Sequence, residues 1–261
     1  MWKSLTAGVI CVVLPGTQVS ADVLESFDYT AGSALAGQSG GSGWNGGWRA
    51  NNGDFIVTQA GLDAPTMTGE TGNAGQSNTT GRYQRTFDQT YDSGVVVLEF
   101  LMSLSSLGSD AYAAFELQSG ADSDPGRVFQ LGTLRGDDGG LTSTYAASSR
   151  TAVGGARAAT LDLGDYDASV RHFAIRFDLD ADTATVFENP AVGTDLLTDP
   201  GVGTLSLFSG FSFDRVGIAR FTGSGPRATF DEIRLTTVPE PGSMGLLLAG
   251  SLAMAARRRR G

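Results

Sequence analysis

The feature that most restricts the fold of this chain is the alternation in residues 171–179, where apolar side chains occupy every second position. They are Phe173, Ile175, Phe177 and Leu179. Successive side chains of a β-strand point to opposite faces, so a period of two predicts a strand with one core face and one face toward water or a ligand. Asp180 and Ala181 then form a predicted turn into a second strand at 183–188.

Short apolar stretches separated by turn residues recur along the chain, which contains 37 glycines in 261 residues. The stretch 95–103, interrupted only by Glu99, is expected to be a central strand covered on both sides. No amphipathic helix of ten residues or more is visible in residues 22–237, and there is no repeat of fixed period. About ten strands are therefore predicted, in an all-β antiparallel sandwich or barrel over residues 22–237. The predicted strands are 24–29, 53–59, 95–103, 111–118, 128–131, 171–179, 183–188, 203–213, 215–221 and 228–236.

Three short motifs narrow the fold further. They are Phe-Asp-Tyr-Thr-Ala-Gly at 27–32 with Gly43-Trp44, the hairpin at 177–190, and Phe-Asp-Glu-Ile-Arg-Leu at 230–235. Together they resemble the concanavalin A-like, laminin G-type jelly rolls that are common in secreted bacterial proteins. The resemblance implies that the closing strand pairs near the first one.

The C-terminal segment 238–261 has three parts. Pro239 and Pro241, on either side of Glu240, favour an extended and accessible segment. The fourteen uncharged residues 243–256 would span about 21 Å as a helix, which is short against a hydrocarbon core of about 30 Å. Four arginines follow, and the positive-inside rule places them on the cytoplasmic side. They are Arg257, Arg258, Arg259 and Arg260.

This order of parts resembles the PEP-CTERM sorting signal of exported proteins in Gram-negative bacteria that produce exopolysaccharide. The resemblance implies recognition of Pro239, Glu240 and Pro241 by a membrane-embedded exosortase, which cuts there and releases or transfers the protein. The alternative is an ordinary membrane tail with a basic stop.

Residues 1–21 have the composition of a secretory signal peptide. Lys3 precedes the apolar stretch 5–14. The segment ends in Val19-Ser20-Ala21, with small residues where signal peptidase requires them, and cleavage is expected after Ala21. The alternative is a retained anchor. Cys11, the only cysteine, lies inside this segment, so the mature chain is expected to have no disulfide and no cysteine metal ligand.

The mature chain is predicted to be strongly acidic. Without Lys3, Glu240 and the four tail arginines it keeps 13 basic and 27 acidic residues, a net charge of about −14, with no lysine. Such a charge argues against nucleic acid and anionic membrane surfaces as partners.

Asp178, Asp180 and Asp182 are the candidate metal ligands, because Ca²⁺ prefers clustered carboxylates. They lack the glycine and glutamate that complete a calcium loop, and aspartate is also a common turn residue. Loop aspartates at 122, 124, 137 and 138 are similar. The sequence predicts no cofactor and leaves Ca²⁺ as a hypothesis.

Glu99 and Glu116 are expected to lie on neighbouring strands, and they are the one pair of carboxylates nominated for a glycoside hydrolase. Such an enzyme needs two carboxylates facing each other about 5–5.5 Å apart for retention. The competing interpretation is that Glu99 is a charged residue at the edge of a sheet and that Glu116 is a solvent-exposed residue. The Glu-x-Asp-x-x-Glu strand of glucanases with this fold does not occur. The single histidine, His172, is accompanied by no cysteine nucleophile and no serine in a Gly-x-Ser-x-Gly motif, so the sequence gives little support for a catalytic triad. No catalytic residue is assigned.

Trp44, Trp48 and Tyr83 are candidates for an aromatic platform that stacks on sugar rings. The competing interpretation is that the two tryptophans fold back to cap the sandwich core.

Three functions remain open. The first is a non-enzymatic protein of the cell surface or exopolysaccharide matrix that makes weak carbohydrate or protein contacts. The second is a secreted polysaccharide-modifying hydrolase or lyase. The third is a purely structural matrix protein.

Overall fold

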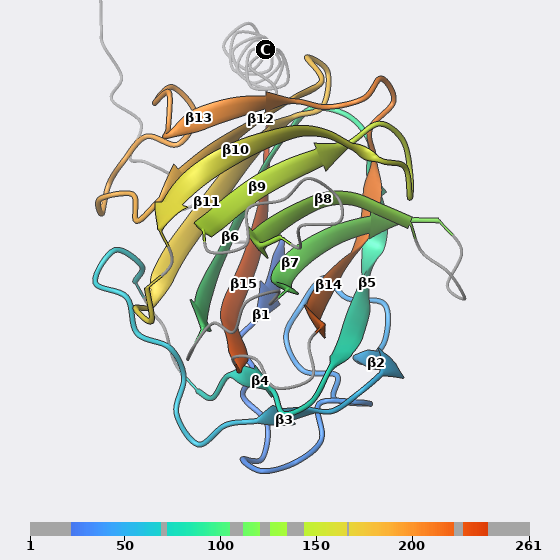
Figure 1. Ribbon diagram of the computed structural model, residues 1–261, viewed down its shortest axis with the longest axis vertical. Helices are drawn as coiled ribbons and strands as arrows, with labels where there is room; N and C mark the ends of the chain where they lie inside the picture. The colour runs from blue at the N-terminus through green and yellow to red at the C-terminus, as the bar shows by residue number, and fades with distance from the viewer. Residues whose placement is uncertain are drawn as a thin grey trace, which may run out of the picture.

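The computed structural model describes residues 22–68, 72–104, 112–120, 126–134, 144–165, 167–221 and 227–239. Within these residues fifteen strands form two antiparallel sheets, which pack face to face as a sandwich (Figure 1). The predicted fold class, an all-β antiparallel sandwich, is therefore confirmed. Among the described residues no helix is long and apolar enough to cross a membrane.

The eight-stranded sheet has the order β13-β12-β11-β6-β15-β4-β3, with β1 paired to β15. Its strands are β1 (Val23–Glu25), β3 (Phe55–Val57), β4 (Gly75–Ser77), β6 (Val95–Leu104), β11 (Arg171–Asp178), β12 (Thr183–Glu188), β13 (Gly203–Ser206) and β15 (Ala228–Val238). The seven-stranded sheet has the order β10-β9-β8-β7-β14-β5-β2. Its strands are β2 (Arg49–Asn52), β5 (Gly81–Tyr91), β7 (Tyr112–Ser119), β8 (Gly126–Thr133), β9 (Thr144–Arg150), β10 (Arg157–Asp165) and β14 (Phe213–Phe221).

The core lies between the sheets and consists of the inward side chains of both. The alternation predicted for β11 is present, because Phe173, Ile175 and Phe177 are all fully buried in this core. β6 lies between β11 and β15, as expected of a central strand. Its outward Leu101 packs with Ala64 and Met67 from the loop between β3 and β4, which covers the second face.

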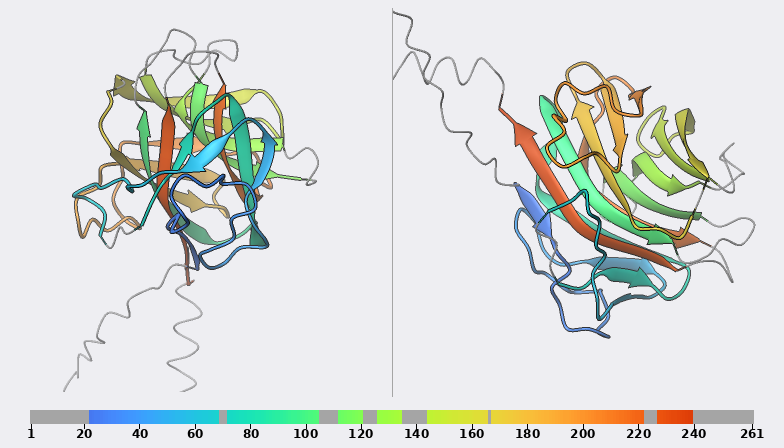
Figure 2. Two further views of the ribbon diagram at one scale, coloured as in Figure 1. Left: turned by 90° about the horizontal axis from the view of Figure 1, so that it is seen from below. Right: turned by 90° about the vertical axis from the view of Figure 1, so that its left-hand side faces the viewer.

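The first and last strands of the sandwich are neighbours. Val23 of β1 pairs with Leu235 of β15, so the closing strand lies beside the opening one, as the jelly-roll resemblance implied. Figure 2 shows the blue β1 beside the red end of β15 at one corner of the molecule.

A buried carboxylate organises the glycine-rich loop 31–48. Glu25 accepts hydrogen bonds from the backbone N–H of Phe27, from the Tyr29 hydroxyl and from the Trp48 indole, and it forms an ion pair with Arg85 of β5. Arg85 also donates to the carbonyl oxygens of Gly40 and Gly46, and its guanidinium lies over the ring of Trp44. The loop is thereby attached to both sheets, since Glu25 comes from one and Arg85 from the other.

Candidate functional site

The two nominated carboxylates lie on opposite faces of the molecule. Glu99 is on β6 between the core residues Leu98 and Phe100, so it points outward from the eight-stranded sheet. Glu116 is on β7 between Phe115 and Leu117, and points outward from the seven-stranded sheet. Packed sheets are about 10 Å apart, so these side chains cannot meet at the 5–5.5 Å that a retaining glycosidase requires. The expectation that they lie on neighbouring strands is wrong, because β6 and β7 belong to different sheets.

Glu116 is the centre of a polar network on its own face. It pairs with Arg82 of β5 at 2.9 Å, and it accepts hydrogen bonds from Tyr112 at 2.5 Å and from the Gln118 amide at 2.6 Å. Gln130 of β8 donates to the Tyr112 hydroxyl. Glu116 has no exposed surface, and burial together with the Glu116 charge raises the pKa of Tyr112. This network links side chains of the strands β5, β7 and β8.

Glu99 instead lies in an open polar pocket on the outer face of the eight-stranded sheet. The neighbouring strands supply its other polar groups, since Arg234 of β15 lies opposite Glu99 in the sheet register, and His172 is on the adjacent β11. The imidazole of His172 is buried, with Nε2 at 3.2 Å from Oε1 of Glu99 and Nδ1 at 3.2 Å from Oγ1 of Thr66. Both ring nitrogens are therefore held, and the ring orientation is fixed.

Two loops complete the walls of this His172 pocket. The loop between β3 and β4 supplies Thr66, Met67 and Thr68, and the loop after β12 supplies residues from Pro190 to Leu196. Arg234 ties the first loop to the sheet, because its guanidinium donates to the carbonyl oxygen of Thr68 at 2.7 Å. The pocket has a volume of about 200 Å³, and Val192 at its rim is 64 % exposed.

The chemistry of the His172 pocket is that of a mixed donor and acceptor site. Arg234 carries a positive charge, while Oε2 of Glu99 accepts no hydrogen bond from any described residue. Sequence reasoning found Glu99 and the polar side of β11, but it missed Thr66 and Arg234. Arg234 could have been found from the sequence, because it belongs to the closing-strand motif at 230–235.

The three aromatic residues proposed as a stacking platform do not form one. Trp48 and Tyr83 are buried in the core, and their rings contact Phe27 and Phe55 respectively. Trp44 is partly buried and packs against the core, with its ring stacked on Phe87. A buried ring has no free face for a sugar, so the expectation has to be corrected. The tryptophans cap the core, which was the competing interpretation.

The candidate metal ligands at the β11–β12 hairpin act as turn residues in the structure. Asp178 accepts a hydrogen bond from the backbone N–H of Ala181 at 2.9 Å, and Asp180 accepts one from Gly94 at 3.1 Å. Asp182 has a positive φ of 51°, which a hairpin turn requires. In the described ranges no group of three His, Cys, Asp or Glu residues is placed to hold a metal ion. The aspartates at 122, 124, 137 and 138 lie outside those ranges.

Of the sorting residues, only Pro239 falls within the described part of the chain, directly after the end of β15. The signal cleavage site at Ala21, Glu240, Pro241, the apolar stretch 243–256 and the four arginines lie outside it.

Residues 237–260 match the family of the PEP-CTERM protein-sorting motif. The chain carries this motif. A PEP-CTERM motif implies exosortase-dependent export, with membrane anchoring before processing. The match covers the tail and begins inside β15, two residues before Pro239.

Solved structures similar to the chain share its fold. The globular domain of T. cruzi calreticulin superposes with a TM-score of 0.54 at 10 % identity, covering 93 % of this chain and 100 % of that one. The binding domain of botulinum neurotoxin serotype G gives a TM-score of 0.50 at 9 % identity, covering 89 % of this chain and 51 % of that one. At such identities the likeness shows the jelly-roll sandwich fold and nothing of ligands. No curated protein sequence matches the chain.

Proposed function

We propose that this is an exported protein, processed by an exosortase, whose sandwich binds carbohydrate at the cell surface or in the exopolysaccharide matrix without altering it chemically. The observation that carries the binding part is the His172 pocket, in which a carboxylate, an imidazole and a guanidinium from three strands meet in a solvent-open hollow on one outer face of the sandwich.

The groups in this pocket suit sugar hydroxyls, which both donate and accept hydrogen bonds. Glu99 offers a carboxylate oxygen, Arg234 a guanidinium and Thr194 a hydroxyl, while Val192 and Pro190 offer apolar contact. The volume of about 200 Å³ is below the roughly 300–1,000 Å³ of sites for drug-sized ligands. A single sugar ring at the end or a branch of a polysaccharide is therefore the proposed ligand. Binding at one ring is expected to be weak, with a Kd of about 1 mM, or about −4 kcal/mol.

The test uses the single histidine as a reporter. The protein recovered from its host is titrated with neutral hexoses, amino sugars, uronic acids and oligosaccharides of the host exopolysaccharide, while the imidazole resonances of His172 are followed by NMR. A saturable shift is expected with one of these classes. Glu99→Gln should weaken binding about tenfold, because a hydrogen bond to a charged group contributes about 1.5–3 kcal/mol.

The matched control is Asp162→Asn, which removes one exposed carboxylate from β10 in the other sheet. It should leave the affinity unchanged. Absence of a shift with every sugar tested, or equal affinity for the Glu99→Gln variant, would contradict carbohydrate binding in the His172 pocket.

A second candidate function, polysaccharide modification by a hydrolase or lyase, is favoured by one observation. Thr66, His172 and Glu99 form a hydrogen-bonded chain of hydroxyl, imidazole and carboxylate, in which a carboxylate orients a potential general base. Release of reducing ends or unsaturated products from host polysaccharide, lost on His172→Ala, would establish this function instead.

A further inference from the structure

The strand that leads into the sorting motif is held by the fold up to its last residue. Val238 pairs with Val95 of β6. The preceding Thr237 donates hydrogen bonds from both its backbone N–H and its hydroxyl to the carboxylate of Asp22. No flexible spacer therefore separates the sandwich from Pro239.

The distance from this strand to the predicted membrane segment is short. Residues 239–242 are four residues, which reach at most about 14 Å when fully extended at about 3.3–3.6 Å each. A membrane-embedded enzyme that reads Pro239, Glu240 and Pro241 must therefore meet the end of the sandwich from which β15 emerges.

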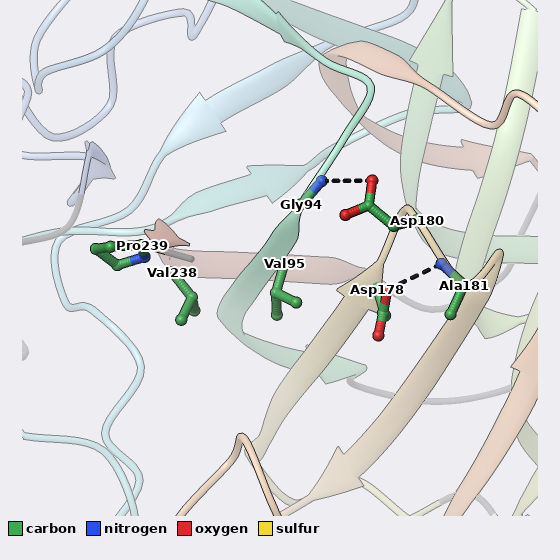
Figure 3. Close-up of a pocket in the computed structure, with 7 residues that line it drawn as sticks. All are labelled: Gly94, Val95, Asp178, Asp180, Ala181, Val238 and Pro239. Atoms are coloured by element: carbon green, nitrogen blue, oxygen red, sulfur yellow. Dashed lines mark hydrogen bonds between the residues drawn. The ribbon is translucent and has the colours of Figure 1, made fainter. Parts of the chain in front are cut away.

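That end of the sandwich contains a pocket whose wall includes the motif itself. It has a volume of about 420 Å³, and Pro239 and Val238 lie across it from Asp178 and Asp180 at the tip of the β11–β12 hairpin (Figure 3). Val95 also lines the pocket and lies between them in this view. We name it the exit pocket.

The exit pocket presents carboxylate oxygens that the fold leaves available. Asp178 uses Oδ1 for the Ala181 N–H, and Asp180 uses Oδ1 for the Gly94 N–H. Neither Oδ2 atom has a hydrogen-bond partner among the residues that the structure describes. Two carboxylates beside the chain disfavour anionic lipid headgroups and favour a protein surface bearing cations or N–H donors.

We propose that the exit pocket is a docking surface for the exosortase, so that the enzyme recognises the folded end of the sandwich together with the Pro-Glu-Pro residues. The inference rests on the exosortase processing that is part of the proposed function. The partner surface is expected to place a basic side chain between Pro239 and the aspartates of the hairpin tip.

The experiment follows loss of the tail in the native host, by pulse-chase and intact mass of the full chain. One variant carries a flexible Gly-Ser insert of about six residues between Val238 and Pro239, which leaves the motif intact but moves it away from the exit pocket. A second, Asp178→Asn with Asp180→Asn, keeps both Oδ1 acceptors and removes both charges. Each is expected to slow processing at least about fivefold, because complementary charge at an interface mainly accelerates encounter.

The matched control is Asp54→Asn with Asp162→Asn, which removes the same charge from two exposed positions elsewhere and should be processed at the wild-type rate. In the spacer background the hairpin substitutions should have no further effect, since the contact is already lost. Resistance of each variant to protease establishes that the sandwich has folded.

Processing of the spacer variant at the wild-type rate or faster would overturn the proposal that the exit pocket is a docking surface. Faster processing would further show that the sandwich hinders access of the exosortase to the motif. Processing of the Asp178→Asn, Asp180→Asn variant at the wild-type rate would show that the two aspartates take no part in docking. A chain with Pro239, Glu240 and Pro241 all changed to alanine tests exosortase processing itself, separately from the docking surface. If wild type and this variant both keep the tail, exosortase processing itself is wrong.

Discussion

Glu25 and Arg85 form an ion pair across the two sheets of the sandwich, with 1 % of each side chain exposed. Removing one partner of such a pair leaves an uncompensated buried charge, at a cost of about 3–5 kcal/mol. Arg85→Met is therefore expected to lower the free energy of unfolding by about this amount, measured by urea denaturation. Adding Glu25→Gln should recover part of the loss, because glutamine is neutral and still accepts hydrogen bonds. A change within about 0.5 kcal/mol for Arg85→Met, the range of ordinary surface substitutions, would show that the pair does not stabilise the fold.

Two glycines of the loop 31–48 differ in what surrounds them, although both have positive φ. A Cβ at Gly41 would lie 2.0 Å from the carbonyl oxygen of Leu24, whereas a Cβ at Gly37 would meet nothing within 4 Å. Gly37→Ala should cost only the conformational strain, about 1–2 kcal/mol. Gly41→Ala should cost clearly more, because backbone has to move. Thermal unfolding of the two variants side by side measures the difference, and equal midpoints would contradict the packing described for Gly41.

Asp231 of β15 gives the fold a specific pH dependence. Burial, reinforced by the charges of Glu232 and Glu25, raises its pKa to about 8, despite hydrogen bonds from the backbone N–H groups of Leu62 and Glu232. The folded state then binds a proton that the unfolded state, with a pKa of about 3.9, has lost. Stability from this group is therefore full below about pH 4 and falls as the pH rises toward 8, by at most about 1.4 kcal/mol per pH unit.

Asp231→Asn should remove this slope, because asparagine stays neutral at every pH. The measurement is the urea midpoint of both proteins at intervals from pH 4 to pH 8. Parallel pH profiles would show that Asp231 titrates normally in the folded protein.

Tyr112 bridges Glu116 and Gln130 on the outer face of the seven-stranded sheet. Tyr112→Phe leaves these buried polar groups without their shared partner, so a loss of about 1–3 kcal/mol in unfolding free energy is expected. Sugar-induced shifts of His172 should remain as in the wild type, because the His172 pocket is on the opposite face. Loss of both stability and sugar response would show that the two faces are coupled.

The fold class and most of the long strands could be predicted from the sequence, because inward side chains such as Phe173 and Phe177 impose a clear period of two. The strand β5 was missed. Its inward positions include Arg85, whose charge breaks the apolar pattern and is compensated only by Glu25, 60 residues earlier. β9 and β10 were missed as well, since alanine, serine and threonine give little contrast between faces.

The candidate site was less predictable. Alternation shows which side of a strand faces the core, but not to which sheet the strand belongs, so Glu99 and Glu116 were placed together although the chain crosses between sheets from β6 to β7. The alternation in β11 placed His172 on the polar face of its strand. Thr66 could not be predicted, because it contacts His172 from a loop 106 residues away in sequence. The aromatic residues were misleading because tryptophan serves a core and a sugar surface equally well.

The position of β15 also determines when the sandwich can be completed. β15 lies between β6 and both β4 and β1, yet it is the last strand in the described part of the chain, so the eight-stranded sheet cannot close until nearly the whole described chain is available. Until then β6 lacks one neighbouring strand, and β1 has only its bridge to Ser42. Completion of the eight-stranded sheet and a fixed position for Pro239 thus both depend on the last described strand. A chain in which β15 has not yet paired has neither a finished sandwich nor an anchored start for the sorting motif.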